Sequence, residues 1–228
     1  MINTNTDIFI IIPSYNETTI LHTVVKGLVS KGFSVIVVDD GSTIKQSNYL
    51  KNLSVYYIRH KLNLGQGAAL QTGMQFALQR GAQYIVHFDA DGQHLPDDVT
   101  TLLLPLLNDK ADIVFGSRFL QPSSALPLKR KRLLKAARYI NYLFTGILLS
   151  DAHNGLRALT AKAAETIVLS ENRMAHASEI LFLVKKNRLR FTEVPVHITY
   201  TDYSQSKGQS AWNSIRIFFD LLLHKLFE

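Results

Sequence analysis

Residues 8–17 read IFIIIPSYNE, residues 35–42 read VIVVDDGS and residues 84–94 read YIVHFDADGQH. Each stretch begins with a run of apolar, mostly β-branched residues and ends abruptly in polar or turn-forming ones. A continuous apolar run, in place of an alternating one, is typical of a strand buried on both faces of a mostly parallel sheet. These three stretches therefore predict an α/β fold.

Two further β-rich runs, residues 55–58 and 113–115, extend the pattern, and amphipathic segments of helical length separate the runs. This order predicts an open, mostly parallel sheet flanked by helices. Ligands of such sheets bind beyond the carboxyl ends of the strands. We therefore expect four polar tips to converge on one site: residues 13–17, 39–42, 89–93 and 116–118.

After residue 120 the regular alternation of β-rich runs and helical segments ends. The sequence predicts a basic helix over about residues 129–149, a loop over 150–157, a helix around 175–186 and a strand over 191–198. A chain of 228 residues with 46% apolar composition is long enough for one sizeable core. We expect one α/β domain with a C-terminal appendage.

The net charge of +7 indicates anionic partners, which include nucleotide phosphates, an acidic membrane surface and nucleic acid. Six basic residues cluster over residues 129–138, which is also what one solvated helix face looks like. No aromatic platform interleaves with these residues, and no helix-turn-helix or zinc pattern is visible. We therefore expect no nucleic-acid partner.

Nothing in the sequence predicts a membrane-spanning or secreted chain. No run of 18 apolar residues occurs, and the longest candidate, residues 139–149, contains Asn141, Thr145 and Gly146. Residues 1–7 lack the basic start and apolar run of a signal peptide, and cysteine is absent. These features indicate the cytoplasm.

Asp89 and Asp91 lie one residue apart after a predicted strand. Two carboxylates at this spacing can meet a divalent ion and a diphosphate in one small volume, and hard oxygen ligands suit Mg²⁺ or Mn²⁺. Gln93 can supply a further oxygen. Two aspartates near a turn also serve as turn formers or helix caps, so the motif alone leaves both interpretations open.

Asp39 and Asp40 also have two interpretations. A carboxylate here can accept hydrogen bonds from uracil or guanine, and Tyr15 and Glu17 on the neighbouring tip can hold base or ribose; the pair can equally form a turn. In residues 63–69, glycines precede a predicted helix, where backbone can approach a nucleotide closely. A plain helix start explains these glycines as well.

The histidines show no metal-ligand spacing. His87 lies within a predicted strand and is expected to be a hydrogen-bonded core residue, whereas His94 and His153 are merely near the predicted site. No Ser-His-Asp triad or Walker loop is present.

The combination of motifs resembles glycosyltransferase family 2, particularly its dolichyl-phosphate mannose synthase-like branch of polyprenyl-phosphate glycosyltransferases. The resemblance spans about residues 8–210. The motifs that carry it are IIPSYNE (11–17), VVDDGS (37–42), NLGQGAALQTG (63–73), DADGQH (89–94), GSRF (116–119), DAHNGLR (151–157), EVPV (193–196) and Ser206-Lys207.

The resemblance implies a GT-A fold and a metal-dependent, inverting transfer of a sugar from a nucleoside diphosphate to a polyprenyl phosphate. Prevalence alone favours UDP over GDP. A saccharide acceptor of a surface polysaccharide and a non-catalytic nucleotide-binding subunit remain alternatives. Residues 1–210 would form the glycosyltransferase domain, with a nucleotide-sugar half over 1–120 and an acceptor half over 121–210.

The resemblance also implies roles for single residues. The expected catalytic residues are Asp91, Arg118, Asp151 and Arg157. The expected donor-binding residues are Pro13, Tyr15, Glu17, Asp40, Gly67, Asp89, Ala90 and Lys207. The expected metal ligands are Asp89, Asp91 and Gln93. Arg118 is expected to face the acceptor phosphate, Arg157 to meet a donor or acceptor phosphate, and Asp151 to lie near the reacting centre as a candidate base.

The chain departs from the family near its end. In the segment usually written R-x-x-G-x-S-K, Thr201 replaces the arginine and Ser204 the glycine. From Trp212 onward, apolar residues form a helical stripe, which predicts an amphipathic helix over 211–228. This helix would pack on the domain, or dock on the cytoplasmic face of a membrane or on a small membrane protein partner.

Overall fold

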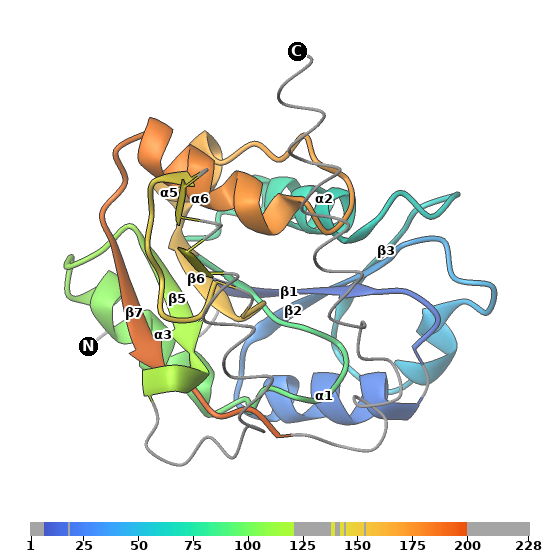
Figure 1. The fold of residues 1–228 in the computed structure, drawn as a ribbon. Coiled ribbons are helices and arrows are strands. Elements are labelled where there is room, and N and C mark those ends of the chain that lie inside the picture. Colours follow the sequence, from blue (N-terminus) through green and yellow to red (C-terminus); the bar gives the residue numbers. More distant parts are fainter. Residues whose placement is uncertain are drawn as a thin grey trace.

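The computed structural model describes residues 7–17, 19–120, 138–139, 142–143, 145–152 and 154–199. Its centre is a seven-stranded sheet, shown in Figure 1. The strands are β1 (Ile8–Ser14), β2 (Ser34–Asp39), β3 (Tyr56–Arg59), β4 (Tyr84–His87), β5 (Ile113–Ser117), β6 (Arg157–Thr160) and β7 (Phe191–Pro195).

The strand order is β3-β2-β1-β4-β6-β5-β7. All neighbouring strands are parallel except β6, which is antiparallel to both β4 and β5. The predicted open, mostly parallel α/β sheet is confirmed.

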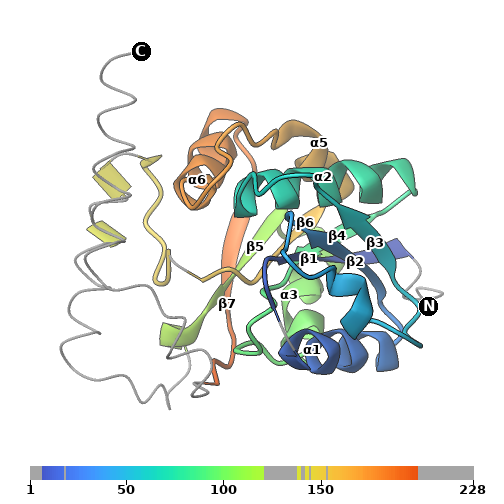
Figure 2. The same cartoon turned by 90° about the vertical axis from the view of Figure 1, so that its right-hand side faces the viewer.

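Helices cover both faces of the sheet (Figures 1 and 2). On one face lie α2 (Gln66–Gln79), α5 (Ala161–Thr166) and α6 (His176–Lys186); on the other lie α1 (Thr19–Ser30) and α3 (Asp98–Leu107). Two short 3-10 helices, η2 (Gln46–Tyr49) and η3 (Arg118–Leu120), follow the ends of β2 and β5.

The continuous apolar run of β1 is explained by these two layers. Ile10 and Ile12 belong to the core cluster beneath α1 and α3, whereas Phe9 and Ile11 belong to the cluster beneath α2 and α6. Ile10, Ile11 and Ile12 have no exposed surface. Burying an isoleucine side chain stabilises a fold by about 1.5–3 kcal/mol, so both faces of β1 contribute to the stability of the fold.

Several predicted boundaries in the second half are wrong. The predicted loop over 150–157 ends where β6 begins, and neither β6 nor α5 was predicted. Residues 147–149 are not helical, because the chain turns at Gly146 with a φ of +68°. The strand predicted over 191–198 ends at Pro195, after which Ile198 forms an isolated bridge with His94. The helix predicted around 175–186 is confirmed as α6.

Candidate functional site

Strand register brings the predicted polar tips to one edge of the sheet. Ser14 pairs with Asp39 at the carboxyl ends of β1 and β2, and His87 at the end of β4 pairs with Arg157. Because β6 is antiparallel, it begins at the edge where its parallel neighbours end. The expectation that the tips converge is confirmed, and residues 151, 152 and 154–157 join them.

The first two tips are bonded to each other. Asn16 donates its backbone N–H to Ser42 Oγ at 2.8 Å, and its Oδ1 accepts from the backbone of Thr43 at 2.9 Å. Asn16 adopts a φ of +52°, which turns the chain back toward β2. Beside this turn Tyr15 is 46% exposed, so the residue is accessible to a ligand.

Asp39 organises the second tip from inside the protein. Its fully buried carboxylate accepts hydrogen bonds from Tyr57 Oη and from the backbone of Ser42 and Gln46, and Arg59 Nε lies 3.3 Å away. Burial raises the pKa of Asp39, but the hydrogen bonds outweigh it and the pKa is lowered. For Asp39 the turn-forming interpretation is correct.

Asp40 is also engaged within the chain. Oδ1 accepts from the backbone of Leu64 at 3.0 Å and lies 2.7 Å from His60 Nδ1, while Oδ2 accepts from Gly65 N at 2.6 Å. His60 in turn contacts Thr72 Oγ1 at 2.9 Å. Asp40 therefore holds the loop before α2, and a base would share oxygens that already accept these bonds.

The glycines before α2 are closely approached by another part of the chain. A Cβ on Gly65 would lie 2.3 Å from the carbonyl oxygen of Asn172, and one on Gly67 would lie 2.0 Å from that of Glu171. Ala68 donates its N–H to Asn172 O at 3.2 Å. These glycines thus allow residues 171–172 to cover the start of α2, a packing role that the local sequence pattern does not reveal.

Three residues lie around the carboxylate of Asp89. Oδ1 accepts from Gln66 Nε2 at 3.0 Å, and Oδ2 lies 3.3 Å from His94 Nε2. Gly155 leaves room for Oδ2, because a Cβ at this position would lie 2.1 Å from it. Burial raises the pKa of Asp89, but the His94 contact and the charge of Arg157 outweigh it, so the pKa is lowered. Asp89 is therefore a stabilised carboxylate.

Asp91 is in the opposite situation. Its Oδ1 accepts from Gln93 N at 3.0 Å, but burial and the negative charges of Asp89 and Glu17 raise its pKa. Among the described residues, no three His, Asp or Glu side chains are already arranged as metal ligands. The repulsion among these carboxylates nevertheless fits a divalent cation, which would relieve it.

A buried basic cluster, His87, Arg157 and His176, lies close to Asp89. Burial lowers the pKa of Arg157 to about 10 and that of His176 to about 4; burial and the charge of Arg157 hold the pKa of His87 well below its usual value. Both histidines are therefore neutral at pH 7. The guanidinium of Arg157 is buried, and its Nη2 donates to Asn154 O at 3.2 Å.

The prediction for His87 is only partly correct. It is 1% exposed, as expected, but neither ring nitrogen has a hydrogen-bond partner in the described part of the chain, so the expectation of a hydrogen-bonded core histidine is wrong. The signal available in the sequence was a single polar residue within the apolar run YIVHF.

The structure brings Arg118 and Asp151 together. Asp151 Oδ2 accepts from Arg118 Nε at 2.6 Å, from Arg118 N at 3.1 Å and from Asn154 Nδ2 at 3.5 Å. Arg118 is 9% exposed and Asp151 3%. Two of the expected catalytic residues therefore form one buried ion pair at the end of β5.

The remaining predicted site residues lie in β1, in the core or outside the described residues. Pro13 lies in β1, and the side chain of Ala90 belongs to the core, which leaves only backbone for a donor. Lys207, His153, Thr201, Ser204, the basic residues 129–135 and the stripe from Trp212 lie outside the described residues.

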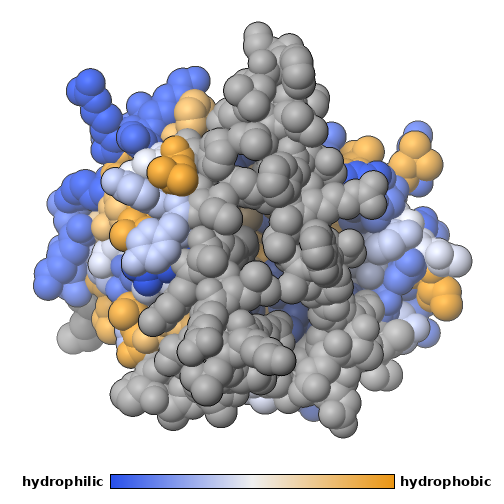
Figure 3. All heavy atoms as spheres, viewed as in Figure 1, coloured by the Kyte–Doolittle hydropathy of each residue, from blue (hydrophilic) through white to orange (hydrophobic). Residues whose placement is uncertain are grey.

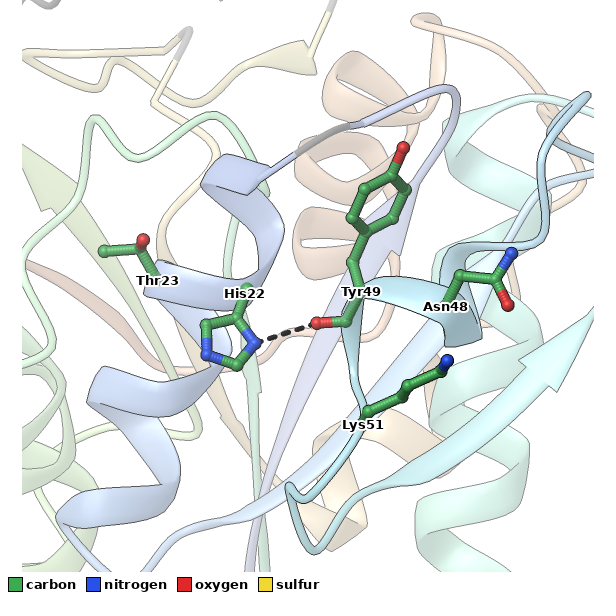
Figure 4. A pocket seen from close by; sticks show the side chains of 5 residues that line it. All are labelled: His22, Thr23, Asn48, Tyr49 and Lys51. Carbon is green, nitrogen blue, oxygen red and sulfur yellow. Dashed lines mark hydrogen bonds between the residues drawn. The ribbon is translucent and has the colours of Figure 1, made fainter.

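An open pocket lies between α1 and η2, lined by His22, Thr23, Asn48, Tyr49 and Lys51 (Figure 4). His22 Nδ1 is 2.8 Å from the carbonyl oxygen of Tyr49. None of the predicted site residues lines it, and we assign it no part in the site.

Within the described residues, no helix is long and apolar enough to cross a bilayer. The described surface visible in Figure 3 is mainly hydrophilic with separate apolar patches. Exposed apolar side chains include Leu62, Leu143 and Val168, which are 73%, 78% and 60% exposed.

Comparisons with known proteins agree with this architecture. The family model described as Glycosyl transferase family 2 matches residues 9–168. A UDP-N-acetylglucosamine–dolichyl-phosphate N-acetylglucosaminyltransferase of Methanococcus voltae is 35% identical, covering 96% of this chain and 96% of its own. A polyprenol monophosphomannose synthase of Mycolicibacterium smegmatis is 29% identical, covering 91% of this chain and 82% of its own.

A solved structure with a similar fold is glucosyl-3-phosphoglycerate synthase from Mycobacterium tuberculosis in complex with Mn²⁺, UDP and glucosyl-3-phosphoglycerate. It superposes with a TM-score of 0.62 at 19% identity, covering 86% of this chain and 72% of that one. The predicted GT-A fold is confirmed.

Proposed function

Because the chain belongs to glycosyltransferase family 2, in its polyprenyl-phosphate branch, we propose that it transfers a sugar from a nucleoside diphosphate to a polyprenyl phosphate. The observation that carries the proposal is the edge of the sheet where a carboxylate pair, Asp89 and Asp91, lies with the buried Arg118–Asp151 ion pair. We place the protein at the cytoplasmic surface of a membrane, where such an acceptor would be reached. Docking through residues 211–228 or through a partner remains a prediction.

The first two tips support the proposed nucleoside site. Tyr15 is exposed, Glu17 lies beside the carboxylate pair, and Asp40 is held rigidly by the loop before α2. Rigid, bonded acceptors lose little entropy when they bind a ligand. Pro13, Gly67, Ala90 and Lys207 complete the proposed donor site. A UDP donor is favoured by the relative from Methanococcus voltae, whose name includes a UDP-sugar.

We assign Asp89, Asp91 and Gln93 to a divalent cation, Mg²⁺ or Mn²⁺. The raised pKa of Asp91 supports this assignment, because carboxylates that repel one another gain most from a shared cation. Bound there, the ion would neutralise negative charge on the leaving nucleoside diphosphate. Within the protein, the contact with His94 and the charge of Arg157 support the Asp89 carboxylate.

On the acceptor side, a phosphate monoester with a second pKa near 6 is largely dianionic at pH 7. Such a nucleophile needs positioning more than deprotonation. We assign this positioning to Arg118, held by Asp151, and propose a single displacement that inverts the anomeric carbon.

The test is sugar transfer from labelled UDP- and GDP-sugars to polyprenyl phosphate in detergent with Mn²⁺, Mg²⁺ or chelator, for wild type and Asp91→Ala. Metal-dependent label in the lipid that Asp91→Ala loses is the expected result, and it identifies the donor. Transfer to a saccharide but not to lipid would replace the proposed acceptor. Donor binding without any transfer would favour a nucleotide-binding subunit.

A further inference from the structure

The EVPV motif, residues 193–196, has no role in the proposal so far. Its first residue, Glu193, lies on β7 at the edge of the sheet, in register with Phe115 of β5. A half-buried carboxylate on an edge strand has water available on its outer side. The carboxylate of Glu193 instead accepts hydrogen bonds from Ser150 and Asp151, beside the predicted site.

Glu193 holds the turn that carries Asp151. Oε1 accepts from Ser150 N at 2.8 Å, from Ser150 Oγ at 2.7 Å and from Asp151 N at 3.3 Å, and Oε2 lies 2.9 Å from Ser150 N. Because Ser150 Oγ donates to Glu193, the 2.6 Å contact between Ser117 and Ser150 is completed by the hydroxyl of Ser117 as donor. Ser117 Oγ accepts from Phe119 N at 3.2 Å.

These bonds form two routes from Glu193 to η3. One runs through Ser150 and Ser117 to η3, the short helix that contains Arg118. The other runs through the backbone of Asp151 to its carboxylate, which accepts from Arg118 Nε and N. Both routes begin at the same carboxylate oxygen. One ends at Arg118, to which we assign the acceptor phosphate, and the other ends at Phe119, the next residue of η3.

We propose that Glu193 is a positioning residue: its carboxylate fixes the Ser150–Asp151 turn and thereby sets the orientation of the Arg118–Asp151 pair. Glu193 acts through these residues and contacts neither donor nor acceptor. The proposal rests on the proposed function for its kinetic consequence, but its structural consequence does not depend on the substrates.

The kinetic test compares wild type with Glu193→Gln, which keeps size and shape but places a donor group where only acceptors fit. Misplacing a reacting group by about 1 Å can lower a rate about 100-fold, so we expect kcat to fall about 10- to 100-fold while KM for the donor changes less than about twofold. In an Arg118→Lys background the same change should add little, because both routes act on Arg118.

A matched control separates positioning from general stability. Asp112 accepts from Arg190 N at 2.8 Å and from its guanidinium, which joins the opposite end of β5 to the start of β7. Asp112→Asn should lower the melting temperature while leaving kcat unchanged. If Glu193→Gln keeps kcat within about twofold of wild type, or loses no more than this control, the proposal is wrong.

A second measurement needs no activity. We expect backbone N–H exchange at Ser150 and at Arg118 to accelerate in Glu193→Gln, although Glu193 has no direct bond to Arg118 N. Acceleration confined to Ser150 would overturn the proposal. If wild type transfers no sugar to polyprenyl phosphate, the proposed function fails, and the exchange at Arg118 still decides the role of Glu193.

Discussion

The carboxylate of Asp151 binds the guanidinium of Arg118 at 2.6 Å, and the same oxygen accepts from the backbone N–H of Arg118 at 3.1 Å. The two residues are separated by 33 positions in the chain, and both are nearly fully buried. A buried charge is tolerated only when it is paired, so each side chain depends on the other for its place in the fold.

Removal of Asp151 should therefore destabilise the protein strongly. In Asp151→Ala the buried guanidinium of Arg118 loses the carboxylate that lies 2.6 Å from its Nε, and we expect the free energy of unfolding in urea to fall by about 3–5 kcal/mol. The control is Asp97→Ala, which removes a carboxylate from the exposed pair Lys31–Asp97, with side chains 37% and 80% exposed. The control should cost at most about 1 kcal/mol. Equal losses of unfolding free energy in the two variants would show that the buried pair contributes no more to stability than the exposed pair.

The neighbouring carboxylates Asp89 and Asp91 should respond oppositely to neutralisation in metal-free protein. The folded-state pKa of Asp91 is raised, so its charge costs stability above the unfolded value of 3.8. The pKa of Asp89 is lowered, so its charge stabilises the fold above the unfolded value of 3.8, and this stabilisation is lost as pH falls through the folded-state pKa.

At pH 7 with chelator, Asp91→Asn should therefore melt above wild type and Asp89→Asn below it. As pH falls to 3.8 and below, both differences should shrink, because the charge of Asp91 is lost in the folded state and that of Asp89 is lost first in the unfolded state. Thermal melts at pH 7, 5 and 3 check this expectation. Shifts of the same sign for the two variants would contradict the electrostatic description of the site.

The space beside Gly155 should be essential for the position of Asp89. A Cβ at Gly155 would lie 2.1 Å from Asp89 Oδ2, so Gly155→Ala must displace the carboxylate. We expect Mn²⁺-dependent nucleotide binding, measured by calorimetry, to weaken about tenfold or more. The control is Gly81→Ala: its φ of +80° strains the variant, but no heavy atom lies within 4 Å of the added Cβ. That variant should lose stability and keep its affinity for nucleotide.

The bond from Tyr57 to Asp39 predicts a pH dependence at alkaline pH. Burial and Asp39 raise the pKa of Tyr57 from 10.0 to about 12. Stability from this phenol is therefore complete below pH 10 and is lost as pH rises through about 12. Tyr57→Phe should cost about 1–2 kcal/mol at pH 8 in urea unfolding, and the difference should narrow above pH 10. In an Asp39→Asn background the cost at pH 8 should be smaller, because a neutral amide oxygen accepts a weaker hydrogen bond than a carboxylate.

Much of the fold follows from local pattern. The apolar runs that became β1, β2 and β4 are recognisable because both of their faces are buried, which suppresses alternation. Strand β6 was missed because its four residues, RALT, show no such run. Its position between β4 and β5 gives it hydrogen-bond partners on both sides, which no local pattern encodes.

The sequence by itself determined at which edge of the sheet the candidate site lies: carboxylates and turn residues follow buried parallel runs, and the carboxyl ends of such strands share one edge. Only the tertiary structure decided which of these groups form hydrogen bonds or ion pairs within the protein. Asp40 is occupied by the loop before α2, Asp151 by Arg118, and the turn of Asp151 by Glu193. The physical reason is that burial and hydrogen bonding depend on partners 25 to 42 positions away, whereas periodicity and spacing report only neighbours along the chain.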